Sequence, residues 1–309
     1  MDIPEISVLI TTYNVAGYIA RTVESVLAQT GVSFEVVIVD DGSSDGTWEI
    51  VCALDDPRIT AIQMEQNAGP SGARNRAIDT ARGEWLAILD GDDVFLPGRL
   101  ERMRNLAATA AADIVVDNQL VMREADGGQS PMFEASALAA EGVLSVASFI
   151  RHNVDFSCGH GYGYFKPLLR AAFLREHGLR YRETIRIGED YVFLLEALAN
   201  GGVCVIDPVP GYGYTVRTGS ISYRLKERDV ASIQTEDVRF FAVYQVSDEA
   251  LAAQRIRARN LIETFAFVQM VAAVKARRPV AFLKAFYSCP RALRQWKKPI
   301  MKRLLRRKA

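Results

Sequence analysis

Short apolar runs alternate with helical patterns over the first 120 residues of the chain. The runs are rich in β-branched residues and cover residues 6–10, 34–39, 58–63, 85–89 and 113–116. Strands this apolar are typical of a sheet that is covered on both faces. Between them, apolar residues recur at helical spacing in residues 18–29, 47–54, 72–81 and 97–108. This alternation predicts an α/β fold with a Rossmann-like, doubly wound and mostly parallel sheet flanked by helices.

The pattern changes after residue 120. Residues 189–199 predict a helix, and residues 203–216 predict two short strands around Pro208 and Pro210. From about Val230 the pattern is helical only. We therefore expect an α/β domain over residues 1–225 and a helical C-terminal extension over residues 226–309.

Polar segments follow three of the predicted strands, at residues 11–14, 40–44 and 90–93. Ligands of open α/β sheets bind beyond the carboxyl ends of the strands. Because these ends meet at one edge of the sheet, we expect the three segments to converge there.

Charge is unevenly distributed, although the formal net charge is zero. Between Thr264 and Ala309 the chain has 13 Lys and Arg and no Asp or Glu, which leaves a net charge of −13 for residues 1–263. Basic amphipathic helices with aromatic residues commonly lie on anionic membrane surfaces, so we expect membrane contact through residues 279–309. Nucleic acid is the rival partner for a basic run, and a helix that packs on the rest of the chain is the third possibility.

The cysteines, Cys52, Cys158, Cys204 and Cys289, are scattered without CxxC spacing. This distribution predicts neither a disulfide framework nor a zinc site and fits a reducing cytosol. The first residues lack the basic segment of a signal peptide, so we expect none. The sequence contains no run of 18 apolar residues, so we expect no transmembrane helix.

The segment Asp90-Gly91-Asp92-Asp93 directly follows a predicted strand. Hard divalent cations such as Mn²⁺ and Mg²⁺ take carboxylate oxygens and often share substrate phosphates, so the segment is a candidate metal site. An acidic turn that caps the next helix is the alternative.

Two further segments have both a binding and a structural interpretation. Asp40 ends a strand, where its carboxylate can accept hydrogen bonds from a nucleobase or ribose, or can simply cap a turn. A calcium loop from Asp41 is excluded because Cys52 stands where the bidentate glutamate is needed. Around Gly72, a glycine-bearing helix start offers free backbone N–H groups to an anion, and Arg74 adds charge.

Gly188-Glu189-Asp190 begins a predicted helix, where acidic residues are favoured by the helix dipole alone. A later loop with Tyr214 and Arg217, followed by Gly219 and Ser220, can reach phosphates or can be a solvated turn.

In combination, these segments resemble the family-2 glycosyltransferases, which have the GT-A fold and invert the anomeric carbon of a nucleotide sugar. The matching stretches occur in the order of the family: SVLITTYN, VVIVDDGSSDGT, NAGPSGARNRAI, GEWLAILDGDD and GED. They cover roughly residues 5–220. The QxxRW signature of processive members is missing, and YTVRTGSIS stands in its region. The chain most resembles bacterial enzymes of exopolysaccharide biosynthesis, including the succinoglycan type.

The resemblance implies roles for residues that match the family motifs. A nucleotide-binding half would span about residues 1–120 and an acceptor half about residues 121–225. Asp190 would be the catalytic base, and Asp92 would bind Mn²⁺ or Mg²⁺ with Asp93 behind it. The resemblance also implies residues that bind the donor. Thr12, Tyr13 and Asp40 would seat a uracil-type base, and Arg74 would approach the base or the diphosphate. Asp90 would contact the ribose or sugar, and Arg217 would assist at the diphosphate.

The resemblance therefore implies a non-processive hexosyltransferase that uses a UDP-sugar, with UDP-glucose as the expected donor. Its acceptor would be a saccharide or lipid-linked oligosaccharide in exopolysaccharide or cell-surface polysaccharide biosynthesis, with no nucleic acid partner. We expect it in the cytoplasm, at the inner face of the plasma membrane. A nucleotidyltransferase, a glycoside hydrolase and a catalytically inactive nucleotide-sugar-binding protein are the alternatives; the hydrolase would leave the Asp40 and Arg74 segments unexplained.

Overall fold

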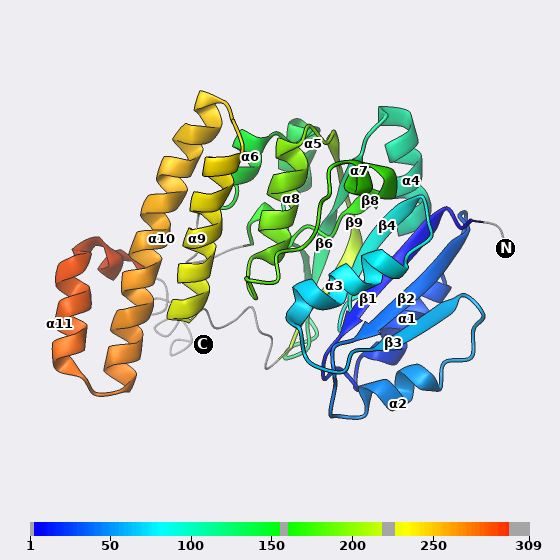
Figure 1. Ribbon diagram of the computed structural model, residues 1–309, viewed down its shortest axis with the longest axis horizontal. Helices are drawn as coiled ribbons and strands as arrows, with labels where there is room; N and C mark the ends of the chain where they lie inside the picture. Colours follow the sequence, from blue (N-terminus) through cyan, green and yellow to red (C-terminus); the bar gives the residue numbers. More distant parts are fainter. Residues whose placement is uncertain (1–2, 155–159, 218–225, 297–309) are drawn as a thin grey trace. The chain divides into compact units, whose positions relative to one another are not determined.

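The computed structural model describes residues 3–154, 160–217 and 226–296, which form two compact units. The first, here called the α/β unit, comprises residues 1–145 and 164–220. The second, the helical unit, comprises residues 146–163 and 221–309. Gly219, Ser220, Cys158 and the basic residues after Trp296 lie outside the described residues. Figure 1 shows the elements of both units in chain order.

A nine-stranded sheet in the order β3-β2-β1-β4-β8-β6-β9-β5, with β7 beside β6, forms the centre of the α/β unit. The first four neighbours are parallel, as are β6 and β9, while β8 runs antiparallel to both β4 and β6. The strands are β1 (Ile6–Thr12), β2 (Phe34–Asp40), β3 (Ile59–Gln63), β4 (Trp85–Asp90), β5 (Val94–Phe95), β6 (Ile114–Arg123), β7 (Gln129–Pro131), β8 (Leu168–Arg170) and β9 (Cys204–Val216).

Helices cover both faces of the parallel part of this sheet. Side chains of α1 and α4 join Val8 and Ile10 of β1 in one buried cluster, whereas Leu9 points to the opposite face, where α3 packs on β1 and β2. The helices of this unit are α1 (Ile19–Leu27), α2 (Thr47–Cys52), α3 (Gly69–Thr80), α4 (Arg99–Ala110), α5 (Ala135–Glu141), α7 (Ala171–Glu176) and α8 (Glu189–Ala199). The predicted fold class is thus confirmed, with α3 lying in front of β1 in Figure 1.

One detail of the prediction is wrong: residues 203–216 contain one long strand, β9 (Cys204–Val216), instead of two. Its pairing with β6 shifts register on both sides of Asn118, opposite Pro208 and Pro210. A bulge of this kind lets a strand carry prolines, which cannot donate to the ladder, without ending. The strand therefore runs unbroken from the core to Val216, directly before Arg217.

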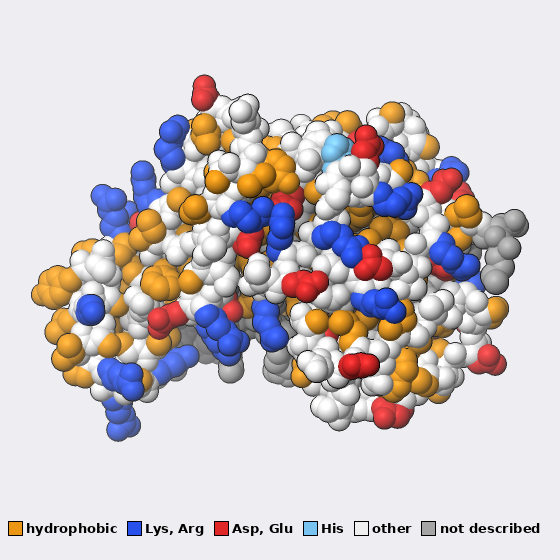
Figure 2. All heavy atoms as spheres, viewed as in Figure 1, with side chains coloured by type: hydrophobic (Ala, Val, Ile, Leu, Met, Phe, Trp, Pro, Cys, Tyr) orange, Lys and Arg blue, Asp and Glu red, His pale blue; other side chains and the backbone are white. Residues whose placement is uncertain are grey.

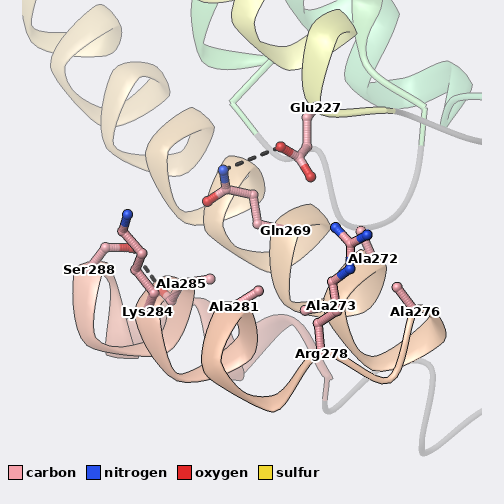
Figure 3. A pocket seen from close by; sticks show the side chains of 10 residues that line it. All are labelled: Glu227, Gln269, Ala272, Ala273, Ala276, Arg278, Ala281, Lys284, Ala285 and Ser288. Carbon is pink, nitrogen blue, oxygen red and sulfur yellow. Dashed lines mark hydrogen bonds between the residues drawn. The ribbon is translucent and has the colours of Figure 1, made fainter.

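The helical unit contains α6 (Val146–Arg151), α9 (Glu227–Val243), α10 (Asp248–Lys275), α11 (Pro279–Ser288) and the 3₁₀ segment η3 (Pro290–Trp296). A second 3₁₀ turn, η1 (Tyr162–Tyr164), crosses from this unit into the α/β unit. A buried ion pair joins Arg257 of α10 to Asp237 of α9 at 2.9 Å. A hollow of about 430 Å³ lies between α10 and α11; half of its lining residues are alanines, and Glu227, Arg278 and Lys284 also line it (Figure 3). Within the described ranges, none of the helices combines the length and apolar character needed to cross a membrane.

Candidate active site

Thr12 and Asp40 end the neighbouring parallel strands β1 and β2, and they are paired in register. Thr12 Oγ1 donates to Asp40 Oδ1 at 2.9 Å, and the Ser43 backbone N–H donates to Asp40 Oδ2 at 3.0 Å. Asp40 is fully buried, whereas Tyr13 is 45% exposed. Among the three residues predicted to seat a nucleobase, Tyr13 therefore differs from the buried Thr12 and Asp40: its side chain is accessible, and its ring can stack on a base.

The start of α3 differs from the prediction. Its first amides, from Ala68 and Gly69, donate to the two carboxylate oxygens of Asp41 at 2.7 and 2.9 Å. Asp41 is buried, and this burial raises the pKa of its carboxyl group. The expectation that these N–H groups are free for an anion is wrong, because the chain supplies its own carboxylate to them.

Asp90 lies at the end of β4, beside Thr11 of β1. Arg74 Nη2 and Lys166 Nζ each lie 2.7 Å from one of its carboxylate oxygens. Burial would raise the pKa of Asp90, but these two cations outweigh it and hold the pKa well below its usual range. The next residue, Gly91, packs so closely on β1 that an added Cβ would lie 2.8 Å from Thr12 Cγ2, so only glycine fits here.

Asp92 and Asp93 are adjacent but have different surroundings. Asp92 accepts a hydrogen bond from Arg217 Nε at 2.7 Å and is partly exposed; burial and the charge of Asp90 together raise its pKa. Asp93 is buried, and its oxygens accept from the Tyr212 hydroxyl at 2.6 Å and the Thr215 backbone N–H at 2.7 Å. Asp93 thus fastens the acidic segment to β9, and Asp92 remains available toward solvent.

Glu189 and Asp190, in the first turn of α8, face the buried guanidinium of Arg74. Arg74 Nη1 lies 2.8 Å from Glu189 Oε1 and 3.2 Å from Asp190 Oδ1. Asp190 Oδ2 accepts from Lys166 Nζ at 2.6 Å, while its buried Oδ1 has no hydrogen-bond partner among the described residues. The structure therefore brings the predicted residues Arg74, Asp90 and Asp190 into one cluster.

Lys166 completes this cluster and is not among the site residues predicted from the sequence. It is the only lysine among the first 225 residues, and it stands between apolar residues just before β8. Charged residues are almost never buried without a partner, so a lone lysine in an apolar stretch is the signal that could have revealed it.

The metal prediction depends on Asp92. Among residues 3–154, 160–217 and 226–296, no three His, Cys, Asp or Glu side chains are grouped to hold an ion. Asp90 is paired with two cations and Asp93 with β9, whereas Asp92 is partly exposed and pairs with one cation, Arg217, so Asp92 is the candidate ligand among the three. This arrangement fits a cation such as Mg²⁺ that takes one or two carboxylates and completes its shell with substrate phosphates and water.

Comparisons with known proteins agree with this architecture. A family model described as glycosyl transferase family 2 matches residues 7–174. The succinoglycan biosynthesis protein ExoO of Rhizobium meliloti (strain 1021) is 41% identical over 304 residues, which cover 98% of this chain and 87% of ExoO.

Two solved structures have the same fold at low sequence identity. S. aureus TarS 1–349, in complex with UDP, superposes with a TM-score of 0.64 at 18% identity, over 93% of this chain and 91% of that one. The mannosyltransferase PcManGT from Pyrobaculum calidifontis, in complex with GDP-Man and Mn²⁺, gives 0.62 at 16% identity, over 99% and 81%. The α/β unit thus has the GT-A fold.

Proposed function

The chain belongs to glycosyl transferase family 2, and we propose that it is an inverting, non-processive hexosyltransferase of exopolysaccharide biosynthesis. In this proposal it moves glucose from UDP-glucose to a saccharide or lipid-linked oligosaccharide acceptor at the inner face of the plasma membrane. The similarity to ExoO, a succinoglycan biosynthesis protein, supports the pathway. The complex of TarS with UDP supports the nucleotide.

One observation carries the assignment of the reacting residues: Lys166 Nζ lies 2.7 Å from Asp90 and 2.6 Å from Asp190. A carboxylate at the end of β4 and one at the start of α8 thus share a single ammonium group. Glycosyl transfer requires the donor sugar and the base that deprotonates the acceptor to be adjacent, and this geometry meets that requirement. In our proposal Asp90 contacts the ribose or sugar, and Asp190 is the base.

The proposed reaction begins when the acceptor hydroxyl approaches Asp190 Oδ1, the oxygen without a hydrogen-bond partner in the described structure. The acceptor oxygen forms a bond to the anomeric carbon as the bond from that carbon to the UDP oxygen breaks on the opposite face. The hydroxyl proton passes to Asp190, and both electrons of the broken bond leave with UDP.

Negative charge on the leaving UDP would be balanced beside Asp92. Asp92 would hold a Mn²⁺ or Mg²⁺ ion, which supplies electrostatic stabilisation of the diphosphate when bound. Arg217 lies 2.7 Å from the same carboxylate and would turn its guanidinium to the diphosphate. Thr12 and Asp40 would border the nucleobase, and Tyr13 would stack on it. Arg74 would approach the diphosphate or the nucleobase only by giving up one of its carboxylate partners.

A donor panel tests this function. The protein is incubated with UDP- and GDP-sugars and an oligosaccharide acceptor, with Mn²⁺, Mg²⁺ or EDTA, and nucleotide release is measured. We expect UDP release that depends on acceptor and metal. Release of pyrophosphate instead would assign the protein to nucleotidyl transfer.

Asp190→Asn tests the base. Loss of the general base lowers the rate by about 10²–10⁴-fold, while UDP binding with Mn²⁺ stays intact. Full turnover in this variant would reject Asp190 as the base.

We also propose that α11 contacts an anionic membrane surface. Val280 and Tyr287 of this helix are 78% and 74% exposed, and Lys284 and Arg278 lie close by. Figure 2 shows hydrophobic and basic side chains next to each other over this end of the helical unit. Apolar side chains beside cations match the interface of an anionic bilayer.

Vesicle flotation tests this contact. We expect binding to vesicles with phosphatidylglycerol and not to phosphatidylcholine alone, and its loss in the double variant Val280→Glu, Tyr287→Glu. Val238→Glu, at a residue of α9 that is 73% exposed, is the matched control. Equal binding by the double variant would refute the role of α11.

A further inference from the structure

Lys166 is a buried lysine beside Asp90 and Asp190, the two carboxylates of the proposed reaction. Its side chain is 6% exposed and lies within one ion cluster that contains Asp90, Glu189, Asp190 and Arg74. The cluster thus has three carboxylates and two cations, and removal of Lys166 would leave Arg74 as the single cation. Burial would lower the pKa of Lys166, but Asp190 and Asp90 raise it above its ordinary value, so the ammonium is a permanent charge.

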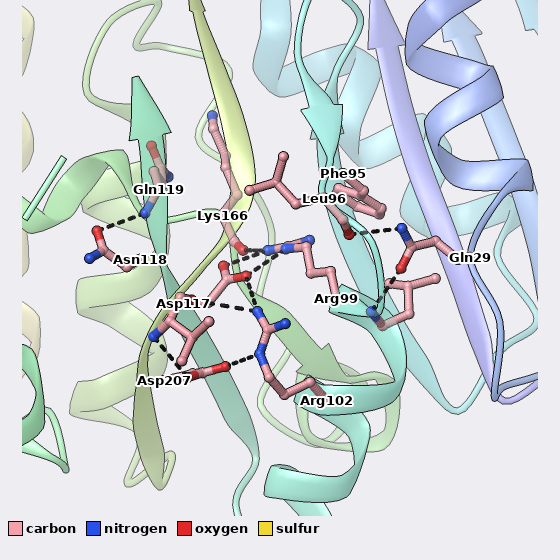
Figure 4. A network of polar contacts seen from close by, with 12 residues as sticks. Gln29, Phe95, Leu96, Arg99, Arg102, Asp117, Asn118, Gln119, Lys166 and Asp207 are labelled. Carbon is pink, nitrogen blue, oxygen red and sulfur yellow. Dashed lines mark hydrogen bonds and ion pairs between the residues drawn. The ribbon is translucent and has the colours of Figure 1, made fainter. Parts of the chain in front are cut away.

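The backbone around Lys166 is held by buried side chains of the α/β unit. Arg99 Nη2 donates to the Lys166 carbonyl oxygen at 2.6 Å, and Arg99 itself pairs with Asp117 of β6 (Figure 4). The carbonyl oxygen of Tyr164, two residues before Lys166, accepts a hydrogen bond from Gln119 Nε2. The backbone that carries the Lys166 side chain is therefore held in place. A side chain needs such support in order to fix the geometry of another group.

The contacts of Lys166 divide the Asp190 carboxylate into two different oxygens. Oδ2 is bound to the ammonium, while Oδ1 faces Arg74 at 3.2 Å without a hydrogen bond. A carboxylate free to rotate would present either oxygen in many orientations. A base must lie within about 2.6–3.2 Å of the proton that it takes, so a fixed orientation has catalytic value.

We propose that Lys166 is a positioning residue that orients Asp190 toward the acceptor hydroxyl and sets its distance from the donor at Asp90. This inference rests on the proposed function, in which Asp190 is the base. The ammonium holds Oδ2 and links β4 to α8 at the reacting centre, and Oδ1, which lies 3.2 Å from Arg74 Nη1, is the oxygen that would take the proton.

Lys166→Met is the main test, with acceptor-dependent UDP release and Mn²⁺–UDP binding measured on the full chain. We expect kcat to fall about 10²-fold, as for other misplaced reacting groups, while the Kd for UDP changes less than about threefold. Lys166→Arg keeps the charge and is expected to recover part of the lost kcat. Arg170→Met is the matched control, because Arg170 is a partly exposed cation four residues after Lys166 that pairs with Asp113 outside the ion cluster.

Combination with Asp190→Asn separates positioning from a general structural effect. Residues that act as a unit are strongly non-additive, so the double variant Lys166→Met, Asp190→Asn should turn over no more slowly than Asp190→Asn alone. Losses that multiply, a loss of UDP binding equal to the loss of kcat, or an Arg variant no better than the Met variant would each overturn the proposal. Full activity of Asp190→Asn would instead reject the base assignment of the proposed function.

Discussion

The buried ion pair between Arg99 and Asp117 provides a quantitative test of the α/β unit. Both side chains are fully buried, with Nε and Oδ2 2.8 Å apart. The guanidinium also lies over the rings of Phe95 and Tyr212. We consider Arg99→Met, which preserves much of the side-chain volume and removes the charge.

The expected cost follows from what this substitution leaves behind. Among the residues that the structure describes, Asp117 would keep one cationic partner, the partly exposed Arg102 at 3.8 Å, and the Lys166 carbonyl oxygen would lose its donor, Arg99. Breaking a buried pair by removing one partner costs about 3–5 kcal/mol. With a urea m-value of about 2–3 kcal/mol/M, the unfolding midpoint should fall by roughly 1–2.5 M.

Replacing both partners of the ion pair separates the cost of an unpaired buried charge from the cost of altered packing. In Arg99→Met, Asp117→Leu no charge remains unpaired, and the unsatisfied Lys166 carbonyl oxygen leaves a cost of about 1–3 kcal/mol. The double variant should therefore be more stable than Arg99→Met alone. Arg104→Met, on the same helix, breaks an exposed pair with Glu5 and should cost less than about 1 kcal/mol.

Tryptophan fluorescence in a Trp296→Phe background gives the assay, because Trp48 and Trp85 both belong to the α/β unit. Urea unfolding of each variant is followed by this signal. A double variant as unstable as the sum of the two single variants, or an Arg99→Met variant within about 1 kcal/mol of the wild type, would refute the reasoning.

Three further predictions concern other residues. Burial would raise the pKa of Glu35, yet hydrogen bonds from Ser7 and Arg82 lower it below 4.5, so Glu35→Gln should cost about 1–3 kcal/mol at pH 7. The stabilisation by Glu35 is present above pH 4.5 and is lost as the pH falls through the lower folded value, so urea unfolding should show the two proteins converging in acid. Cys204 is buried and its pKa is raised, so peptide mapping after alkylation should find the exposed Cys52 modified first; early labelling of Cys204 would contradict its burial. Asp92→Ala should abolish the Mn²⁺ dependence of UDP release, and unchanged Mn²⁺ titrations would exclude it as the ligand.

The hydrophobic pattern predicted the centre of the fold because β1, β2 and β4 are buried on both faces. The same pattern predicted that Thr12, Asp40 and Asp90 lie at one edge of the sheet, since the carboxyl ends of neighbouring parallel strands lie on the same side. The strands extend one or two residues beyond the apolar runs, to polar residues that hydrophobicity alone does not include.

The parts that escaped prediction depend on contacts between distant segments. Lys166 reaches Asp90 because β8 inserts antiparallel beside β4, and a strand of three residues carries too little pattern to reveal its direction. Asp41 fills the start of α3 from another loop, so the local sequence around Gly69 suggested an open anion site. In both cases the deciding partner lies in a segment remote along the chain.

The burial of Lys166 also determines how the protein can be handled chemically. Since the first 225 residues contain no other lysine, amine-reactive dyes and surface-coupling reagents have no exposed lysine side chain to attack in the α/β unit. Lysine coupling is thereby directed to residues 226–308, where Lys275 and Lys284 lie. A preparation immobilised or labelled through lysine would keep the end of β4 at Asp90 and the start of α8 at Asp190 unmodified.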